Sequence, residues 1–528
     1  MQTGIREHLE KLKNENMIKT ITEEIDLRYV SAIIAQNEKA VIFTNPKGYP
    51  GQILVGGLYA NRDLTALAYN CQYENTWKKT DRAKDNPREP VILNEEPKWE
   101  VVQEGDEVNL ASLPLPVLAK RDGAPYISAA ITGSFDPDRG YNWGVYRYQL
   151  LNRNTIAVDL TTQNNAHNAL KKAYREGRKF GVTVNIGNHP YEFLASAMDL
   201  PPDVDEMTVA GGLREEPVEL LEGNSVEARS IANSEYVLEG EFLPGGWYHK
   251  EGRFGEFHGL MGSVHHNPVL RVNRLVRRRE AHLYTLQMPD EVYHMHKPIV
   301  QRAAYEALTE AGIEPVAVNV PVGGCTSFHI IASIKKFPGA GKNAITALTN
   351  VGIAKHIVVT DEDIDVFNLE EVEWAIATRV QVENDVMILP NMGRAKPLDP
   401  VIPPDMDPML ITRLGIDATI PEGIPEWRYQ RIEYPHVEDI AEDVLSENKI
   451  SSLGAEVPEF ENTIEELSEE MYDFLSSSEP LYYFDVLDHY STIPHRTVVE
   501  AFSLMEEEGK LDRDDQGRYL INKGDDCE

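Results

Sequence analysis

Short apolar runs alternate with amphipathic helical segments along most of this 528-residue chain. Residues 5–12 place apolar side chains at helical spacing, and residues 40–43 and 53–58 are apolar runs of strand length. This mixture is typical of an α/β fold. We therefore predict an N-terminal α/β domain over residues 1–115, which ends at the proline-rich residues 113–116.

Strand signals dominate the next region, residues 116–315. Residues 145–151 and 155–160 flank a short polar turn and predict a β-hairpin, in which Arg147 shares one face with Val145 and Gln149. The asparagines at 164 and 165 predict the start of a helix with His167 in its first turn. Backbone N–H groups at such a helix start favour an anion such as phosphate.

The last two regions differ in character. Residues 316–454 again alternate apolar runs with helical stretches and predict a second α/β domain. Residues 455–528 are acidic and have the helix, helix, hairpin order of a winged helix. The second of these helices continues into glutamates 506–508, whereas a DNA reader needs a basic helix, so we interpret this appendage as an interaction or oligomerisation element.

The composition argues against several classes of partner. Asp and Glu number 86 against 51 Lys and Arg, and the net charge of −35 disfavours binding to nucleic acid or to an anionic membrane. The three cysteines are scattered and predict neither a disulfide framework nor a zinc site. The chain has no apolar run of membrane-spanning length and begins without a secretory signal, so we expect a cytoplasmic protein.

The segment richest in chemistry is residues 251–256, in which Glu251 and Glu256 enclose two glycines. A loop of this kind is usually a solvated hairpin. If the fold brings Arg147 to the two acids, however, the three side chains form a group that can hold and transfer a proton.

Three further polar residues, Asn142, His167 and Glu206, lie in the same region. Each has a simpler interpretation, as a turn residue, a surface histidine and a helix cap respectively. In their order along the chain, all these residues resemble the UbiD family of reversible decarboxylases over roughly residues 30–435. The resemblance also rests on the motifs at residues 142–147, 206–214, 234–240, 251–259, 398–400 and 415–419.

The resemblance implies a cofactor and a set of site residues. Asn142, His167 and Glu206 match ligands of a divalent ion, Mn²⁺ or Mg²⁺, which bridges the protein to the phosphate of prenylated flavin mononucleotide (FMN). An amide, an imidazole and a carboxylate suit such an ion. K⁺ is a further ion that the resemblance allows. Arg147, Glu251 and Glu256 match the family's catalytic network.

Other residues are matched to the cofactor. Val145 and Tyr146 are expected to contact its phosphate through the backbone, and Arg147 to lie beside it. Met198 matches a residue that lines the flavin, although an ordinary core methionine is the alternative. Lys396 is expected to reach either the cofactor phosphate or a substrate carboxylate.

The implied architecture has four parts. They are an N-terminal α/β domain, a central split β-barrel of flavin-reductase-like type that binds cofactor and metal, a C-terminal α/β domain that contributes to oligomerisation, and the winged-helix-like appendage. The expected partners are a small carboxylic acid with its product CO₂, a flavin prenyltransferase that supplies the cofactor, and further copies of the chain in a dimer or hexamer.

The expected activity is non-oxidative decarboxylation of an aromatic, heteroaromatic or α,β-unsaturated carboxylic acid, with Glu256 as the proton donor. Two alternatives keep the same chemistry, namely carboxylation in the reverse direction and action on an aryl-CoA thioester. The arginines at 274 and 277–279 could supply a basic entrance for the latter. A DNA-binding regulator built on an inactive enzyme body is the alternative from another class.

Overall fold

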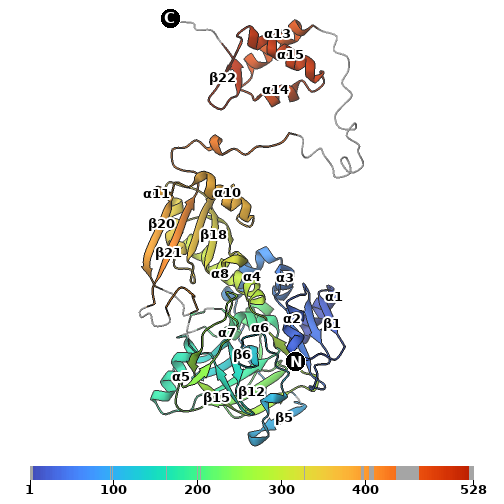
Figure 1. The fold of residues 1–528 in the computed structure, drawn as a ribbon, viewed down its shortest axis with the longest axis vertical. Helices are drawn as coiled ribbons and strands as arrows, with labels where there is room; N and C mark the ends of the chain where they lie inside the picture. Colours follow the sequence, from blue (N-terminus) through green and yellow to red (C-terminus); the bar gives the residue numbers. More distant parts are fainter. Residues whose placement is uncertain are drawn as a thin grey trace. The chain divides into compact units, whose positions relative to one another are not determined.

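The computed structural model describes residues 4–95, 97, 99–161, 163–198, 200–201, 204–325, 327–393, 398–403, 409–435 and 463–522. The chain forms two compact units, Met1–Pro421 and Glu422–Glu528 (Figure 1). In the part of the chain that is described, every helix is too short or too polar to cross a membrane.

The N-terminal region is built on a four-stranded sheet with the order β1-β2-β3-β16. Its strands are β1 (Ile18–Ile21), β2 (Ala40–Phe43), β3 (Ile53–Gly56) and β16 (His282–Thr285). The strand β16 comes from far along the chain and pairs in parallel with β3. The helices of this region are α1 (Ile5–Asn14), α2 (Val30–Ile34), α3 (Arg62–Tyr69) and α4 (Thr76–Asp85).

The centre of the molecule is a closed barrel of six strands, in the order β12-β9-β6-β7-β8-β15 with an additional pairing between β12 and β15. The strands are β6 (Tyr126–Asp136), β7 (Gly140–Leu150), β8 (Thr155–Val158), β9 (Gly181–Ile186), β12 (Tyr236–Phe242) and β15 (Val269–Arg277). A seventh strand, β5 (Val101–Glu104), pairs with β15 outside the closed ring. The predicted mixed α/β fold with a central barrel is therefore confirmed.

The barrel and the N-terminal region exchange strands, so that each sheet contains one strand from the other part of the chain. The strand β5 lies within residues 1–115 yet joins the barrel sheet, whereas β16 follows the barrel strands and joins the N-terminal sheet. The domain limits at 115, 315 and 454 therefore stay predictions.

The predicted hairpin is present as β7 and β8, which pair with Tyr148 opposite Val158 and Leu150 opposite Ile156. The predicted helix start is also present, because the Asn164 side chain caps α5 (Asn165–Arg175) by accepting the His167 backbone N–H at 2.9 Å. Helices α6 (Pro190–Ser196) and α7 (Glu206–Arg214) follow. Minor strands are β4 (Val91–Ile92), β10 (Glu219–Leu221), β11 (Ser230–Ile231), β13 (His249–Glu251) and β14 (His265–Asn267).

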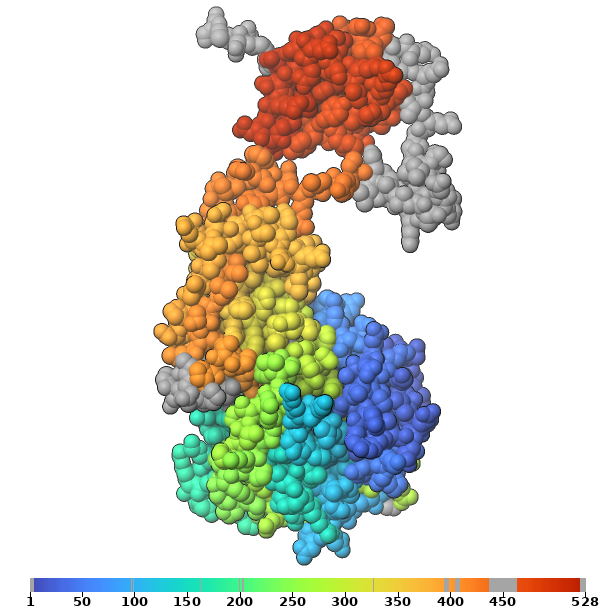
Figure 2. All heavy atoms as spheres, viewed as in Figure 1, coloured from blue at the N-terminus to red at the C-terminus, as the bar shows by residue number. Residues whose placement is uncertain are grey.

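The third region is a five-stranded sheet with the order β17-β18-β19-β21-β20. Its strands are β17 (Pro315–Asn319), β18 (His329–Ile334), β19 (His356–Asp361), β20 (Val386–Met392) and β21 (Ile411–Ala418), and its helices are α9 (Ala340–Leu348), α10 (Leu369–Arg379) and α11 (Val382–Asp385). The long helix α8 (Asp290–Glu310) leads into it and lies beside α4. The same contact is visible where light blue meets yellow-green in Figure 2.

Short 3₁₀ turns complete the connections: η1 (Leu27–Tyr29), η2 (Tyr73–Asn75), η3 (Gly105–Glu107), η4 (Leu110–Ser112), η5 (Val322–Gly324) and η6 (Glu426–Tyr429). The second unit contains α13 (Ile464–Ser477), α14 (Tyr483–His489), α15 (His495–Glu507), β22 (Leu511–Arg513) and β23 (Tyr519–Ile521). Its small core includes Leu467, Met471 and Phe502. The predicted helix, helix, hairpin order is thus observed.

Candidate active site

Arg147, on β7, lies among three carboxylates. Its Nε and Nη2 donate to the two oxygens of Glu251, each at 3.2 Å, and its Nη1 donates to Glu256 Oε1 at 2.5 Å. Its Nη2 also lies 3.1 Å from Asp159 Oδ2, and the arginine side chain is only 10% exposed. The fold therefore brings together the arginine and the two glutamates that the sequence pointed to, and adds a third acid.

The loop that carries both glutamates is held against β7 by close backbone contacts. Gln149, on the same predicted face as Arg147, accepts the Gly252 N–H at 3.3 Å. Gly123 donates its N–H to Arg253 O at 2.8 Å, and a Cβ at Gly123 would lie 2.2 Å from Gly252 O. Only glycine permits this approach, which sets the distance between the loop and the arginine.

Asp159 and Asn267 complete the network, and sequence reasoning missed both. Asp159 directly follows β8, and its Oδ1 accepts the Thr161 backbone N–H at 3.1 Å and the Thr161 hydroxyl at 2.5 Å. Asn267 Nδ2 donates to Glu251 Oε2 at 3.1 Å and lies 3.4 Å from Asp159 Oδ1. No local motif links these residues to residues 251–256, and the one available signal was a polar residue at the end of a predicted strand.

The charges of this network decide where a proton resides. Burial raises the pKa of Glu256, and the neighbouring Asp159 and Glu251 add to this increase, so that Arg147 does not restore the ordinary value. Burial acts the same way on Asp159, but Arg147 and the Thr161 hydrogen bonds outweigh it and lower the pKa of Asp159. Of these two acids, Glu256 is therefore the one whose protonated form the site favours.

The network opens into a cavity of about 580 Å³, a size suited to an organic cofactor or substrate. Arg147 and Asp159 line it together with the predicted residues Asn142, Val145, Tyr146, Met198 and Glu206. Apolar side chains form much of the remaining wall: Leu200, Phe254, Leu286, Met288, Val292 and Met295. Acid, arginine and polar ligand groups thus meet in one partly apolar chamber.

Glu206 begins α7 and points its carboxylate at β7. Its Oε2 accepts the Trp143 backbone N–H at 2.9 Å, while the side chain of Asp205 caps the helix through the Met207 N–H. The helix-cap interpretation of Glu206 is therefore wrong, because Asp205 has that role. Burial raises the pKa of Glu206 to about 7. A nearby cation would be needed to keep this buried carboxylate ionised.

His167 is buried and its ring orientation is set by the protein. Its Nδ1 lies 2.8 Å from Leu160 O, and its ring packs against Trp247 with centroids 4.5 Å apart. If Nδ1 donates to that carbonyl, the Nε2 lone pair is left for a metal ion. His167 is not part of the cavity wall, although Asn164 and Asn165 at the start of α5 are.

The donor set fits a hard divalent ion. Asn142 and Glu206 line the cavity. His167 lies in the first turn of α5, close in the chain to Asn164 and Asn165, which also line the cavity. Within the described ranges, no three His, Cys, Asp or Glu side chains gather so as to hold a metal alone. The predicted set has only two such residues and needs the Asn142 amide, so it suits Mn²⁺ or Mg²⁺ rather than a thiolate-seeking metal.

Three family models match the chain, in the same order as its three regions. Sequence models of 3-octaprenyl-4-hydroxybenzoate carboxy-lyase match with its N-terminal domain at residues 9–84, its Rift-related domain at residues 91–291 and its C-terminal domain at residues 294–418. The chain belongs to the UbiD family. It is accordingly a carboxy-lyase, a UbiD-class decarboxylase of carboxylic acids.

Curated UbiD-class relatives carry different substrate names. The chain is 31% identical to anhydromevalonate phosphate decarboxylase of Methanothermobacter thermautotrophicus, over 81% of this chain and 99% of the relative. It is 30% identical to a phenolic acid decarboxylase of a Streptomyces species, over 79% and 92%. These similarities support the reaction class and leave the acid open.

Among solved structures, the chain resembles the UbiD-class enzyme HmfF from Pelotomaculum thermopropionicum in complex with FMN. The TM-score is 0.77 at 31% identity, over 84% of this chain and 99% of that one. An evolved dimeric form of HmfF in complex with prenylated FMN gives 0.75 at 29% identity, over 84% and 100%. Homologous UbiD enzymes thus bind FMN or its prenylated form.

Two further predicted features of this UbiD enzyme are not seen at the cavity wall formed by the described residues. Lys396 lies outside the described residues. The arginines at 274 and 277–279 are absent from the cavity wall formed by the described residues. Arg274 is buried and bound to Glu239 at 3.1 Å and to Glu104 at 3.2 Å, so its charge is balanced within the chain.

Proposed function

We propose that this UbiD enzyme removes CO₂ from an aromatic, heteroaromatic or α,β-unsaturated carboxylic acid with the help of prenylated FMN. The observation that carries the proposal is one buried guanidinium, that of Arg147, bound to Glu251, Glu256 and Asp159 at the wall of a cavity that Asn142 and Glu206 also line. Such a network can retain a proton and release it toward a reacting atom inside the cavity.

The need for a cofactor follows from the reaction. Loss of CO₂ from an sp² carbon leaves an electron pair in the plane of the double bond, where the substrate itself cannot delocalise it. When bound, prenylated FMN supplies the electron sink that side chains lack. Val145, Tyr146 and Met198 would line its binding place, and Asn142, His167 and Glu206 would hold Mn²⁺ or Mg²⁺ near its phosphate.

The protein then supplies orientation and a proton. Glu256 enters the reaction protonated, because burial and two neighbouring acids favour its neutral form. After CO₂ leaves, the carboxyl proton of Glu256 passes to the substrate carbon, and Arg147 holds the resulting carboxylate by the contact it already makes. Asp159 and Glu251 keep the guanidinium in place, and the apolar wall limits competing water.

The decisive experiment is reconstitution followed by a substrate screen. The full chain is co-expressed with a flavin prenyltransferase and examined by absorbance and mass spectrometry for prenylated FMN. CO₂ release is then measured over a panel of phenolic, furan, other heteroaromatic and α,β-unsaturated acids. Release from one of these acids that depends on the prenylated form supports the proposal, and release that is equal without the cofactor would refute it.

The same residues serve the reverse direction, since a group that donates a proton to carbon also removes one. Carboxylation is tested by ¹³C-bicarbonate incorporation into the product at high bicarbonate concentration. The aryl-CoA alternative loses Arg274 as a support, because this arginine is paired with acids of the chain. Competition by free CoA would nonetheless reveal such a substrate directly.

The regulator alternative is not favoured for the second unit. The described residues 463–522 contain 15 acids and 4 Lys or Arg, which opposes binding to a phosphate backbone. We expect a homo-oligomer, a dimer or hexamer, which is supported by the dimeric form described for HmfF. Light scattering of the reconstituted enzyme measures this directly.

A further inference from the structure

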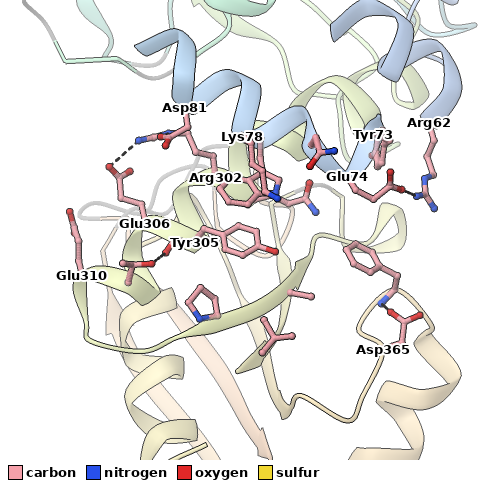
Figure 3. Close-up of a pocket in the computed structure, with 18 residues that line it drawn as sticks. Arg62, Tyr73, Glu74, Lys78, Asp81, Arg302, Tyr305, Glu306, Glu310 and Asp365 are labelled. Carbon is pink, nitrogen blue, oxygen red and sulfur yellow. Dashed lines mark hydrogen bonds and ion pairs between the residues drawn. The ribbon is translucent and has the colours of Figure 1, made fainter. Parts of the chain in front are cut away.

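Two hollows adjoin helix α4 and share the residues Asn75 and Lys78. The larger, of about 950 Å³, is formed by α4, η2, α8 and β17 (Figure 3). The smaller, of about 640 Å³, is formed by α4 with the C-terminal ends of α3 and α7. Neither belongs to the active-site cavity, and the proposed reaction uses no residue of either.

The smaller hollow is basic in an acidic chain. Four cations line it, Lys78, Lys79, Arg82 and Arg88, and the acid among its described lining residues is Glu215. Within the part of the chain that the structure describes, none of the four forms an ion pair with an acid. This is unexpected in a chain with 35 excess negative charges, where Arg62 and Arg302 nearby are both paired.

The position of Lys79 strengthens this picture. Its Nζ donates to the Tyr191 hydroxyl at 3.2 Å and lies 4.8 Å from the centre of that ring, so the amine is half-buried and forms no ion pair with a described acid. Burial lowers the pKa of Lys79, and it lowers the pKa of the neighbouring Lys11 with an added repulsion from Lys79. Four cations against the one acid Glu215 among the described lining residues leave an excess of positive charge, which a bound anion would relieve.

The larger hollow has an aromatic floor. Trp77 of α4 and Tyr305 of α8 stack with centroids 4.1 Å apart and an interplanar angle of 11°. Phe367 and Val316, which are 45% and 43% exposed, extend this apolar surface toward solvent. In Figure 3 the carboxylates of Glu306 and Glu310 lie on one side of the Tyr305 ring and Asp365 lies on the other.

The two neighbouring hollows, which share Asn75 and Lys78, together offer three kinds of contact: cations, an aromatic surface and carboxylates. We propose that they bind a nucleotide, with its phosphate among Lys78, Lys79, Arg82 and Arg88 and its base on the aromatic floor. Amino groups on the edge of the base donate to the carboxylates at the rim. Each part of the ligand thus meets the side chains whose chemistry complements it.

The test compares three ligands that differ by one part. Isothermal titration calorimetry is performed on the full, flavin-loaded enzyme, in which the flavin site is filled, with AMP, ribose 5-phosphate and adenosine. AMP is expected to bind about tenfold or more tightly than either fragment, since one stacked base and one charged phosphate each contribute on that scale. Equal affinity for AMP and ribose 5-phosphate would overturn the proposal.

The variant R82Q/R88Q removes two exposed cations of the basic hollow, and K13Q/K19Q removes two exposed cations elsewhere in the same region. AMP affinity should fall about tenfold in the first and stay unchanged in the second. Phe367→Ala should weaken AMP but not ribose 5-phosphate. AMP binding that is indifferent to R82Q/R88Q, in protein that unfolds at the wild-type temperature, refutes the site.

Discussion

Two groups of cations in this protein have opposite surroundings. Arg147 is 10% exposed and touches Asp159, Glu251 and Glu256, whereas Arg82 and Arg88 line an open hollow and form no ion pair with the described acids. An arginine enclosed by acids of its own chain is already neutralised, so its value lies in tuning and holding those acids. Exposed cations that form no ion pair keep their charge, and this is why we propose that Arg82 and Arg88 meet a bound phosphate.

The largest effect is expected from Glu256→Gln, which leaves the arginine contact but removes the proton. Turnover should fall by about 10²–10⁴ or more, because a positioned general acid contributes on that order. CO₂ release and hydrogen–deuterium exchange at the product carbon measure it, and the flavin absorbance should stay unchanged. Glu10→Gln, on the exposed face of α1, is the control. Exchange at the wild-type rate would remove Glu256 from this role.

Arg147→Met tests whether the guanidinium holds the acids together. It leaves three carboxylates close together in a largely buried site without their cation, so the free energy of unfolding should drop by about 3–5 kcal/mol at neutral pH. Urea unfolding measures the loss. The deficit should shrink as the pH falls, because protonation of the carboxylates relieves their repulsion. A pH-independent deficit would mean that lost packing, not charge, is responsible.

Asp159→Asn tests the third acid as a positioning and tuning residue. In the proposed reaction, activity requires protonated Glu256 and is expected to fall as the pH rises through the raised pKa of Glu256. Removing the charge of Asp159 lowers that pKa, and the falling limb of the kcat profile should move to lower pH. The exposed Asp106→Asn variant should leave the limb in place. A falling limb that stays in place in Asp159→Asn would show that Asp159 does not tune the pKa of the proton donor.

The same shift has a consequence for stability. A carboxyl whose pKa is higher in the folded than in the unfolded chain stabilises the fold fully below the unfolded value, and this contribution is lost as the pH rises through the folded value. Wild type should therefore lose stability relative to Glu256→Gln as the pH rises above the ordinary carboxyl pKa of 4.5. Paired urea titrations between pH 4 and 8 measure the difference, and the opposite slope would contradict it.

The smallest effect is expected at Arg82 and Arg88, which form no ion pair with a described acid. Because Arg82 and Arg88 are exposed and unpaired among the described residues, R82Q/R88Q should change the free energy of unfolding by less than about 0.5 kcal/mol. Its decarboxylation rate without nucleotide should equal that of wild type. A large loss of either stability or rate would show that these arginines support the fold, and the contrast with Arg147 would fail.

Much of the local structure could be predicted, because its causes are close in the sequence. The β7–β8 hairpin follows from two alternating runs around a polar turn, and the start of α5 follows from Asn164, which caps the His167 N–H. Glu206 was harder, because Asp205 beside it is an equally good cap, and only the 2.9 Å contact to the Trp143 N–H separated the two. Two adjacent carboxylates fit the cap position equally well in the sequence, and only the observed hydrogen-bond partner of each one shows which of them caps the helix.

By itself, the sequence determined the mixed α/β fold, the order of helices and hairpin in the second unit, and the pairing of Arg147 with Glu251 and Glu256 through family resemblance. Only the tertiary structure decided that Asp159 and Asn267 join that pairing, that β12 closes the barrel on β15, and that α4 meets α8 beside a basic hollow. The reason is physical. Periodicity and capping act between neighbours in the chain, whereas a charge network forms between side chains more than a hundred residues apart, whose separation depends on how the whole barrel closes.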